Sequence, residues 1–148
     1  MSRIDSLLED YASFHQTKGN KACHFVGVPL IIFGILSMLH SLQVSSLTAA
    51  EVFVLLSFFY YLTLHLPLAV GMLLIAAFID LAAYAVGSIL FGLATFIMGW
   101  IFQAIGHAVF EKKSPAFLKN ITHLMVGPLF LLNELLHIRP ITLRTQTS

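Results

Sequence analysis

Apolar residues fill one long central part of the chain, and polar residues gather at its two ends. Between residues 22 and 110 there is no Lys or Arg, and the formal charges are Glu51 and Asp80. Short polar or turn-forming segments divide this interval into apolar runs over about residues 22–42, 48–66, 68–86 and 89–110. Each run is near the roughly 20 residues that a helix needs to cross a bilayer. The pattern predicts an all-α, polytopic membrane helix bundle with four transmembrane helices.

The segment before the first run has the pattern of an amphipathic helix. Ile4, Leu8 and Tyr11 recur at helical spacing over residues 2–14, with acidic residues on the other side. We expect this N-terminal helix to be interfacial, with its apolar face on the membrane surface. The pair Gly19-Asn20 follows, and we expect the chain to bend there.

The segment after the last run is less regular. An apolar stretch from residue 116 to about residue 137 is interrupted by polar residues and by Pro128. Because proline disrupts the interior of a helix, this stretch predicts a bent C-terminal helix followed by a loose polar tail. Residues 1–21, 22–110 and 111–148 are then three parts of a single membrane domain.

Composition agrees with this class. The chain is 58% hydrophobic and 10% charged, with a mean hydropathy of +0.89, whereas soluble domains carry about 25% charged residues. A net charge of +1 does not indicate a nucleic-acid partner. Cys23 is the sole cysteine, so an internal disulfide is excluded. The N-terminus lacks the pattern of a signal peptide, and we expect the first apolar run to direct insertion.

The placement of charge predicts the topology. Four spans return the chain to its starting side, so all Lys and Arg collect on one face, which the positive-inside rule identifies as cytoplasmic. Both termini of this integral, multi-pass protein would then be cytoplasmic. The histidines of both flanks, His15, His24 and His107, would meet at that face. Three spans would instead place His107 on the opposite side.

The candidate chemistry lies at the two edges of the apolar interval. Gln103, His107 and Glu111 are four apart and would share one helix face. Polar groups at the edge of a membrane span are costly unless they are paired or ligated. Imidazoles are common ligands of Fe, Zn and Cu, so His15, His24 and His107 form a candidate metal site. The alternative is a helix end whose polar side chains face water.

Other polar residues allow more than one role. Glu111 or Glu134 could complete a ligand shell, or orient an imidazole from outside it. Asn20 and Gln103 could hold an imidazole tautomer or a substrate carboxylate, and ordinary helix capping is the alternative. Asp80 lies deep in the third run, where a carboxylate needs a partner, and a structural hydrogen bond is the favoured role.

Two stretches of the sequence carry a family resemblance. In YASFHQTKGNKACHFVGVP, the matching positions are Tyr11, His15, Asn20, His24 and Pro29. In GWIFQAIGHAVFEKKSPAF, they are Gly99, Trp100, Gln103, Gly106, His107, Glu111, Lys112, Pro115 and Ala116. A looser third match comprises Pro128, Phe130 and Glu134. The chain therefore resembles the small membrane 2-hydroxy fatty acid dioxygenases of yeast-type alpha-oxidation.

The resemblance implies an Fe(2+)-dependent enzyme that uses O2 to shorten a 2-hydroxy fatty acid by one carbon. By position, His15, His24 and His107 would hold the iron, and His40 is a possible fourth family histidine. Membrane lipid would surround the protein, and an oligomer is possible. The absence of a retention signal favours a bacterial inner-membrane protein, whereas a eukaryotic member would lie in the endoplasmic reticulum. The alternatives are a non-catalytic lipid-binding or scaffold protein and a metal-dependent lipid hydroxylase or hydrolase.

Overall fold

The protein is mostly helical, as predicted. The computed structural model describes residues 2–115, 118 and 121–141. A short β-hairpin joins two of the helices. Its strands, β1 (Gln43–Val44) and β2 (Leu47–Thr48), have two residues each. The helices are α1 (Arg3–Ser13), α2 (Lys18–Leu39), α3 (Ala49–Leu62), α4 (Leu66–Val86), α5 (Ile89–Ile105), the π-helix η1 (Gly106–Glu111) and α6 (His123–Leu136).

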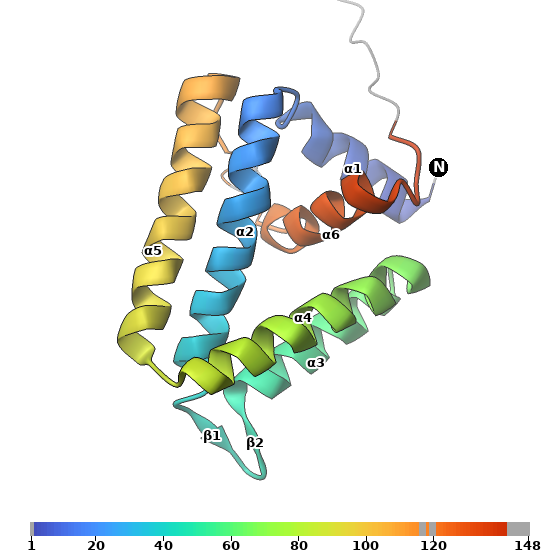
Figure 1. The fold of residues 1–148 in the computed structure, drawn as a ribbon. Helices are drawn as coiled ribbons and strands as arrows, with labels where there is room; N and C mark the ends of the chain where they lie inside the picture. The colour runs from blue at the N-terminus through green and yellow to red at the C-terminus, as the bar shows by residue number, and fades with distance from the viewer. Residues whose placement is uncertain (1, 116–117, 119–120, 142–148) are drawn as a thin grey trace, which may run out of the picture.

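Helix length supports fewer complete membrane crossings than the four predicted. Three described helices are long and apolar enough to span a bilayer: α2, α4 and α5 continued by η1. The second predicted span is α3, whose 14 residues extend only ~21 Å at 1.5 Å per residue. The chain nevertheless reverses direction at each helix from α2 to α5 (Figure 1). His24 and His107 therefore lie at the same end, although three of the described helices, and not four, have full spanning length.

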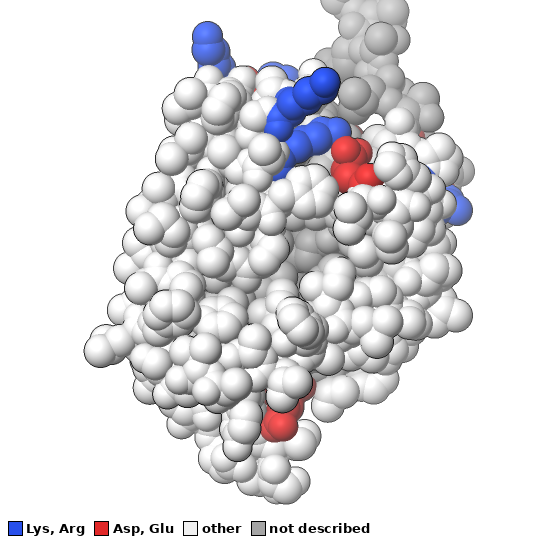
Figure 2. Space-filling model, in the orientation of Figure 1, with Lys and Arg blue, Asp and Glu red and all other residues white. Residues whose placement is uncertain are grey.

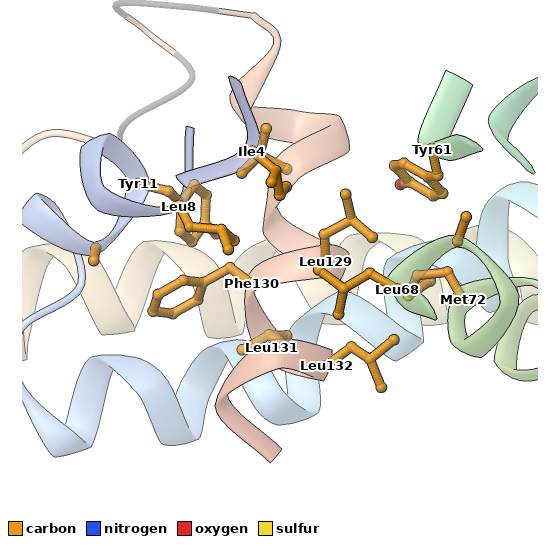
Figure 3. Close-up of a cluster of buried hydrophobic side chains, with 13 residues drawn as sticks. Ile4, Leu8, Tyr11, Tyr61, Leu68, Met72, Leu129, Phe130, Leu131 and Leu132 are labelled. Carbon is orange, nitrogen blue, oxygen red and sulfur yellow. The ribbon is translucent and has the colours of Figure 1, made fainter. Parts of the chain in front are cut away.

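The apolar face of the N-terminal helix packs against protein, whereas we expected lipid there; the interfacial position of the helix stays a prediction. Its apolar side chains, Ile4, Leu8 and Tyr11, are 1%, 1% and 5% exposed. They contact α6, whose Leu129 and Phe130 lie between α1 on one side and the α3–α4 pair on the other (Figure 3). The amphipathic pattern predicted the helix correctly, but it could not distinguish a lipid surface from α6 as the apolar partner.

Two local predictions are corrected. The chain bends over residues 14–17, before Gly19-Asn20, because Thr17 caps α2 by accepting from the backbone N–H of Asn20. The C-terminal helix begins at His123, well after residue 116, and contains Pro128. Parts of the predicted C-terminal segment, residues 116–117, 119–120 and 142–148, lie outside the described residues, so the predicted loose tail is untested there.

Helices α2 and α5 are packed together through glycines. A Cβ added to Gly27 would lie 2.8 Å from the carbonyl oxygen of Gly99. One added to Gly34, two turns further along α2, would lie 2.5 Å from the carbonyl oxygen of Gly92. Small residues permit such close approach of membrane helices, whose association depends on van der Waals packing. The antiparallel α2–α5 pair is thus a close-packed support for the residues at its upper end.

The outer surface suits a membrane. Lys and Arg gather at the end that holds the α1–α2 turn, and a broad flank without charge lies below them (Figure 2). Large apolar side chains are exposed on that flank; Leu74, Phe78 and Leu90 are 67%, 75% and 78% exposed. Contiguous apolar surface of this extent is typical of an interaction site, and here the surrounding helices favour lipid as the partner.

The glycine contacts predict a large effect from one methyl group. Gly34→Ala places a methyl against backbone, which cannot yield as a side chain does, so we expect about 1–3 kcal/mol of destabilisation from overpacking. Thermal unfolding of the detergent-purified protein measures this. Gly71→Ala is the control, because its Cβ meets the flexible end of Leu132 at 2.9 Å. Equal stability of the two variants would contradict a backbone-limited α2–α5 contact.

Candidate metal centre

Two imidazoles face each other at the start of α2. The Nδ1 of His15 lies 2.8 Å from the carbonyl oxygen of Tyr11, and the Nδ1 of His24 lies 2.9 Å from the carbonyl oxygen of Asn20. A carbonyl oxygen can only accept, so each Nδ1 carries the proton and donates it. Each Nε2 is then left with its lone pair, and the two Nε2 atoms are 3.0 Å apart.

The third imidazole comes from the π-helix. The ring of His107 lies 4.8 Å from that of His15 and 4.9 Å from that of His24, between centroids. One ligand atom from each of the three side chains lies within 4.8 Å of the other two. All three residues are buried, with exposed fractions of 2–4%. Single π-helical turns are rare and are frequent at functional sites.

A glycine lets this turn approach α2 closely. Any side chain at Gly106 would overlap the side-chain oxygen of Asn20. Beyond the π-helix the chain leaves through Lys112 in the left-handed region, at φ 55°. The approach of η1 to the first turn of α2 therefore depends on a glycine immediately before His107.

Two of the three rings lie at the spacing of ligands that share one cation. Two lone pairs at 3.0 Å repel each other unless a proton or a metal ion lies between them. Burial, reinforced by the neighbouring His24, lowers the pKa of His15 to about 3, which opposes the proton. Nitrogens bound to one metal at ~2.1 Å are ~3.0–3.4 Å apart in octahedral or tetrahedral shells, which matches the observed separation. Neutral imidazoles suit Fe, Zn or Cu.

The rings lie at one end of a cavity of about 390 Å³. Its walls are apolar over most of their extent, and Gln103, Trp100 and Tyr11 line it close to the histidines in sequence or in space. A cavity of this size, largely apolar with a few convergent polar groups, is the usual form of a small-molecule site. The arrangement can hold a long apolar ligand with its polar end at the imidazoles.

Glu111, at the end of η1, is hydrogen-bonded to the turn that carries His15. Its carboxylate accepts from the backbone N–H of Gln16 at 3.1 Å, from the N–H and hydroxyl of Thr17 at 3.1 and 3.0 Å, and from Nδ2 of Asn20 at 3.1 Å. Hydrogen bonds to a carboxylate are charge-assisted and strong. The described group of candidate ligands contains the histidines and not Glu111. The geometry thus favours a positioning role over the predicted ligand role.

The other predicted site residues separate into two sets. Gln103 lines the cavity, whereas Asn20 is not among its lining residues and donates to the carbonyl oxygen of Phe14 and to Glu111. Glu134 accepts from Nζ of Lys21 at 2.6 Å, and among the described residues no hydrogen bond joins it to an imidazole of the site. It links α6 to α2 beside the site.

Sequence reasoning missed the place of His123. This residue lines the cavity and is 2% exposed, its Nε2 lies 2.8 Å from the carboxylate of Asp10, and its Nδ1 has no partner among the described residues. A carboxylate accepts, so Nε2 of the neutral imidazole carries the proton and donates it to Asp10, and Nδ1 then presents a lone pair. The sole signal in the sequence was an unexplained histidine in an apolar helix.

The possible fourth family histidine, His40, lies elsewhere. It is near the opposite end of α2, where its Nε2 is 2.9 Å from the carboxylate of Asp80. This contact supplies the partner that a carboxylate in an apolar helix needs. Thr48 also approaches His40, with its hydroxyl oxygen 3.2 Å from Nδ1. The pair joins α2 to α4 and does not belong to the group formed by the other three rings.

Comparison with known proteins shows the family of the chain. A family model described as "2-hydroxy-palmitic acid dioxygenase Mpo1-like" matches residues 1–138. The chain belongs to the Mpo1-like family. It is 35% identical over 138 residues to the 2-hydroxy-palmitic acid dioxygenase MPO1 of Saccharomyces cerevisiae, covering 90% of this chain and 79% of that protein. No solved structure matches the chain.

The region that matches the Mpo1-like family model includes every residue of the candidate centre, because it contains α1, α2, η1 and α6. The resemblance seen in the two sequence signatures is therefore confirmed at the level of the family. The yeast relative is named as an enzyme that oxidises a 2-hydroxy fatty acid.

The hydrogen bonds that Glu111 accepts from the turn before α2 predict a partial loss of metal affinity when they are disturbed. Glu111→Gln keeps the side-chain shape but replaces one acceptor oxygen with a donor that faces other donors. Because it disturbs a group that holds a ligand in place, we expect metal binding to weaken by about 10–100-fold. Competition with a chelator measures the affinity of the purified protein.

Glu134→Gln is the matched control and should bind metal as the wild type does. Wild-type affinity in Glu111→Gln would refute the positioning role. Complete loss of binding, equal to that of a variant lacking an imidazole, would instead make Glu111 a direct ligand.

Proposed function

We propose that this protein is an Fe(2+)-dependent enzyme that oxidises 2-hydroxy fatty acids with O2 and shortens them by one carbon. The observation that carries the proposal is the buried group of His15, His24 and His107 at the end of an apolar cavity. The family supports the substrate class, because the yeast relative is named for 2-hydroxy-palmitic acid.

The overall reaction needs no reductant besides the substrate. A 2-hydroxy acid and O2 yield the acid one carbon shorter, CO2 and water, which balances all atoms. The hydroxyl-bearing carbon loses three electrons and the carboxyl carbon loses one, and these four reduce O2. The iron bound by the imidazoles would supply the O2 activation that the spin state of O2 otherwise forbids.

The residues of the chain position the substrate for this reaction. His15, His24 and His107 leave coordination positions open for substrate and O2, since three ligands do not complete a shell. Gln103 is buried at the cavity wall, where its amide can bind the carboxylate of the substrate. The unpartnered Nδ1 of His123 can accept a hydrogen bond from the 2-hydroxyl group.

The apolar walls hold the acyl chain and exclude water. The bundle would sit in a membrane with the imidazoles near the cytoplasmic face, because the Lys and Arg lie at that end. A fatty acid in the inner leaflet has the same arrangement, with its head at the surface and its chain in the hydrocarbon. Both termini are cytoplasmic in this orientation.

Metal content and product analysis test the proposal together. Detergent-purified wild type loaded with Fe(2+) under anaerobic conditions should retain about one ion per chain, as expected for a single three-imidazole site. His107→Ala should lose the ion and all turnover, because two imidazoles remain. Elemental analysis measures the iron, and mass spectrometry detects the acid one carbon shorter from a long-chain 2-hydroxy acid.

The alternatives give different outcomes. A lipid-binding or scaffold protein would retain no metal of any kind and yield no product, which would overturn the proposal. Product formed equally without O2 would indicate a metal-dependent hydrolase. His137→Ala is the control variant, since its side chain lies at the C-cap of α6, and it should keep both iron and activity.

A further inference from the structure

The cavity follows one face of α2 away from the imidazoles. His24, Val28, Ile31 and Ile35 line it, at spacings of four, three and four residues, which place them in one stripe. At 1.5 Å per residue, the stripe from His24 to Ile35 is ~17 Å long. The cavity is therefore elongated, with polar groups at one end only.

A packed core closes the far end. Leu36 of α2 and Val54 of α3 line the cavity and also belong to a buried cluster that continues to Ala50 and Ala83, which do not line it. Leu36 and Ala50 are both 0% exposed. Phe53 of α3 and Ala76 of α4 complete this end. A ligand reaching these side chains meets close-packed protein, which does not yield easily to additional volume.

We propose that this closed end selects the chain length of the substrate, with Phe53 and Ala76 as the residues that determine specificity. The inference rests on the proposed function, because it assumes that the carboxyl end lies at the imidazoles. With the head held there, the methyl end of the chain falls at a depth set by its number of methylenes. One methylene more or less in an apolar pocket changes selectivity by about 10–200-fold.

Substitutions of Ala76 and Phe53 should shift the preferred chain length of the substrate in opposite directions. Ala76→Leu fills the closed end and should favour shorter acids, whereas Phe53→Ala opens it and should favour longer ones. Ala77→Leu is the matched control, because Ala77 is the next residue of α4 and is exposed on the outer face. It adds the same side chain without reaching the cavity, and should keep the wild-type profile.

The experiment presents 2-hydroxylauric, 2-hydroxypalmitic and 2-hydroxyarachidic acids together to each full-length protein in detergent. Product ratios from the iron-loaded enzyme give the selectivity. Binding to the metal-free protein gives a second readout, through the fluorescence of Trp100, the sole tryptophan, which lines the cavity. We expect the ratio of shorter to longer acids to rise at least about 10-fold in Ala76→Leu and to fall similarly in Phe53→Ala.

The two proposals fail in different ways. Turnover with the same length profile in wild type, Ala76→Leu and Phe53→Ala would overturn the length selection and leave the function intact. Shifted binding in the metal-free variants without turnover by any of them would support length selection and overturn the enzyme. If Ala76→Leu does not fold, the opposite shift in Phe53→Ala still decides the inference.

Discussion

Two neutral imidazole nitrogens that face each other at 3.0 Å inside a protein repel each other unless a proton or a metal ion lies between them. Much of the remaining structure supports this contact. The carbonyl oxygens of Tyr11 and Asn20 fix the tautomers, so the lone pairs point inward. Burial opposes protonation, and the buried histidines could instead hold a metal ion that relieves the repulsion. The contact joins the turn between α1 and α2, which carries His15, to α2 itself, and the fold holds that turn in place from several sides.

The supports come from elements that are distant in sequence. Close contact of α2 with α5 fixes the position of the π-helix along α2, relative to His24. Gly106 leaves room for the π-helix to contact the first turn of α2. Glu111 then bonds to the turn itself. On the other side, α6 covers α1 and contributes His123 to the cavity wall. The polar centre is thus rigidly held, while the apolar cavity extends from it between the helices.

The sequence predicted the helices and the meeting of three histidines, because hydrophobic runs, charge placement and local spacing carry that information. It left two roles open for Glu111, because an ideal helix places that carboxylate beside His107, whereas in the structure it reaches the turn before α2. The sequence also did not predict the pairs His40–Asp80 and Asp10–His123. Each joins helices far apart in the chain, and no local pattern encodes such contacts. Likewise, the amphipathic pattern of α1 did not indicate that α6 covers its apolar face.

Iron K-edge X-ray absorption of the iron-loaded protein tests the shared cation most directly. The account predicts nitrogen donors at ~2.1 Å with the outer-shell scattering of imidazole rings, and a coordination shell that is not filled by protein alone. Loss of part of the imidazole signal on His15→Ala would agree with it. A spectrum of oxygen donors without imidazole scattering would contradict it, because the facing nitrogens would then hold no metal.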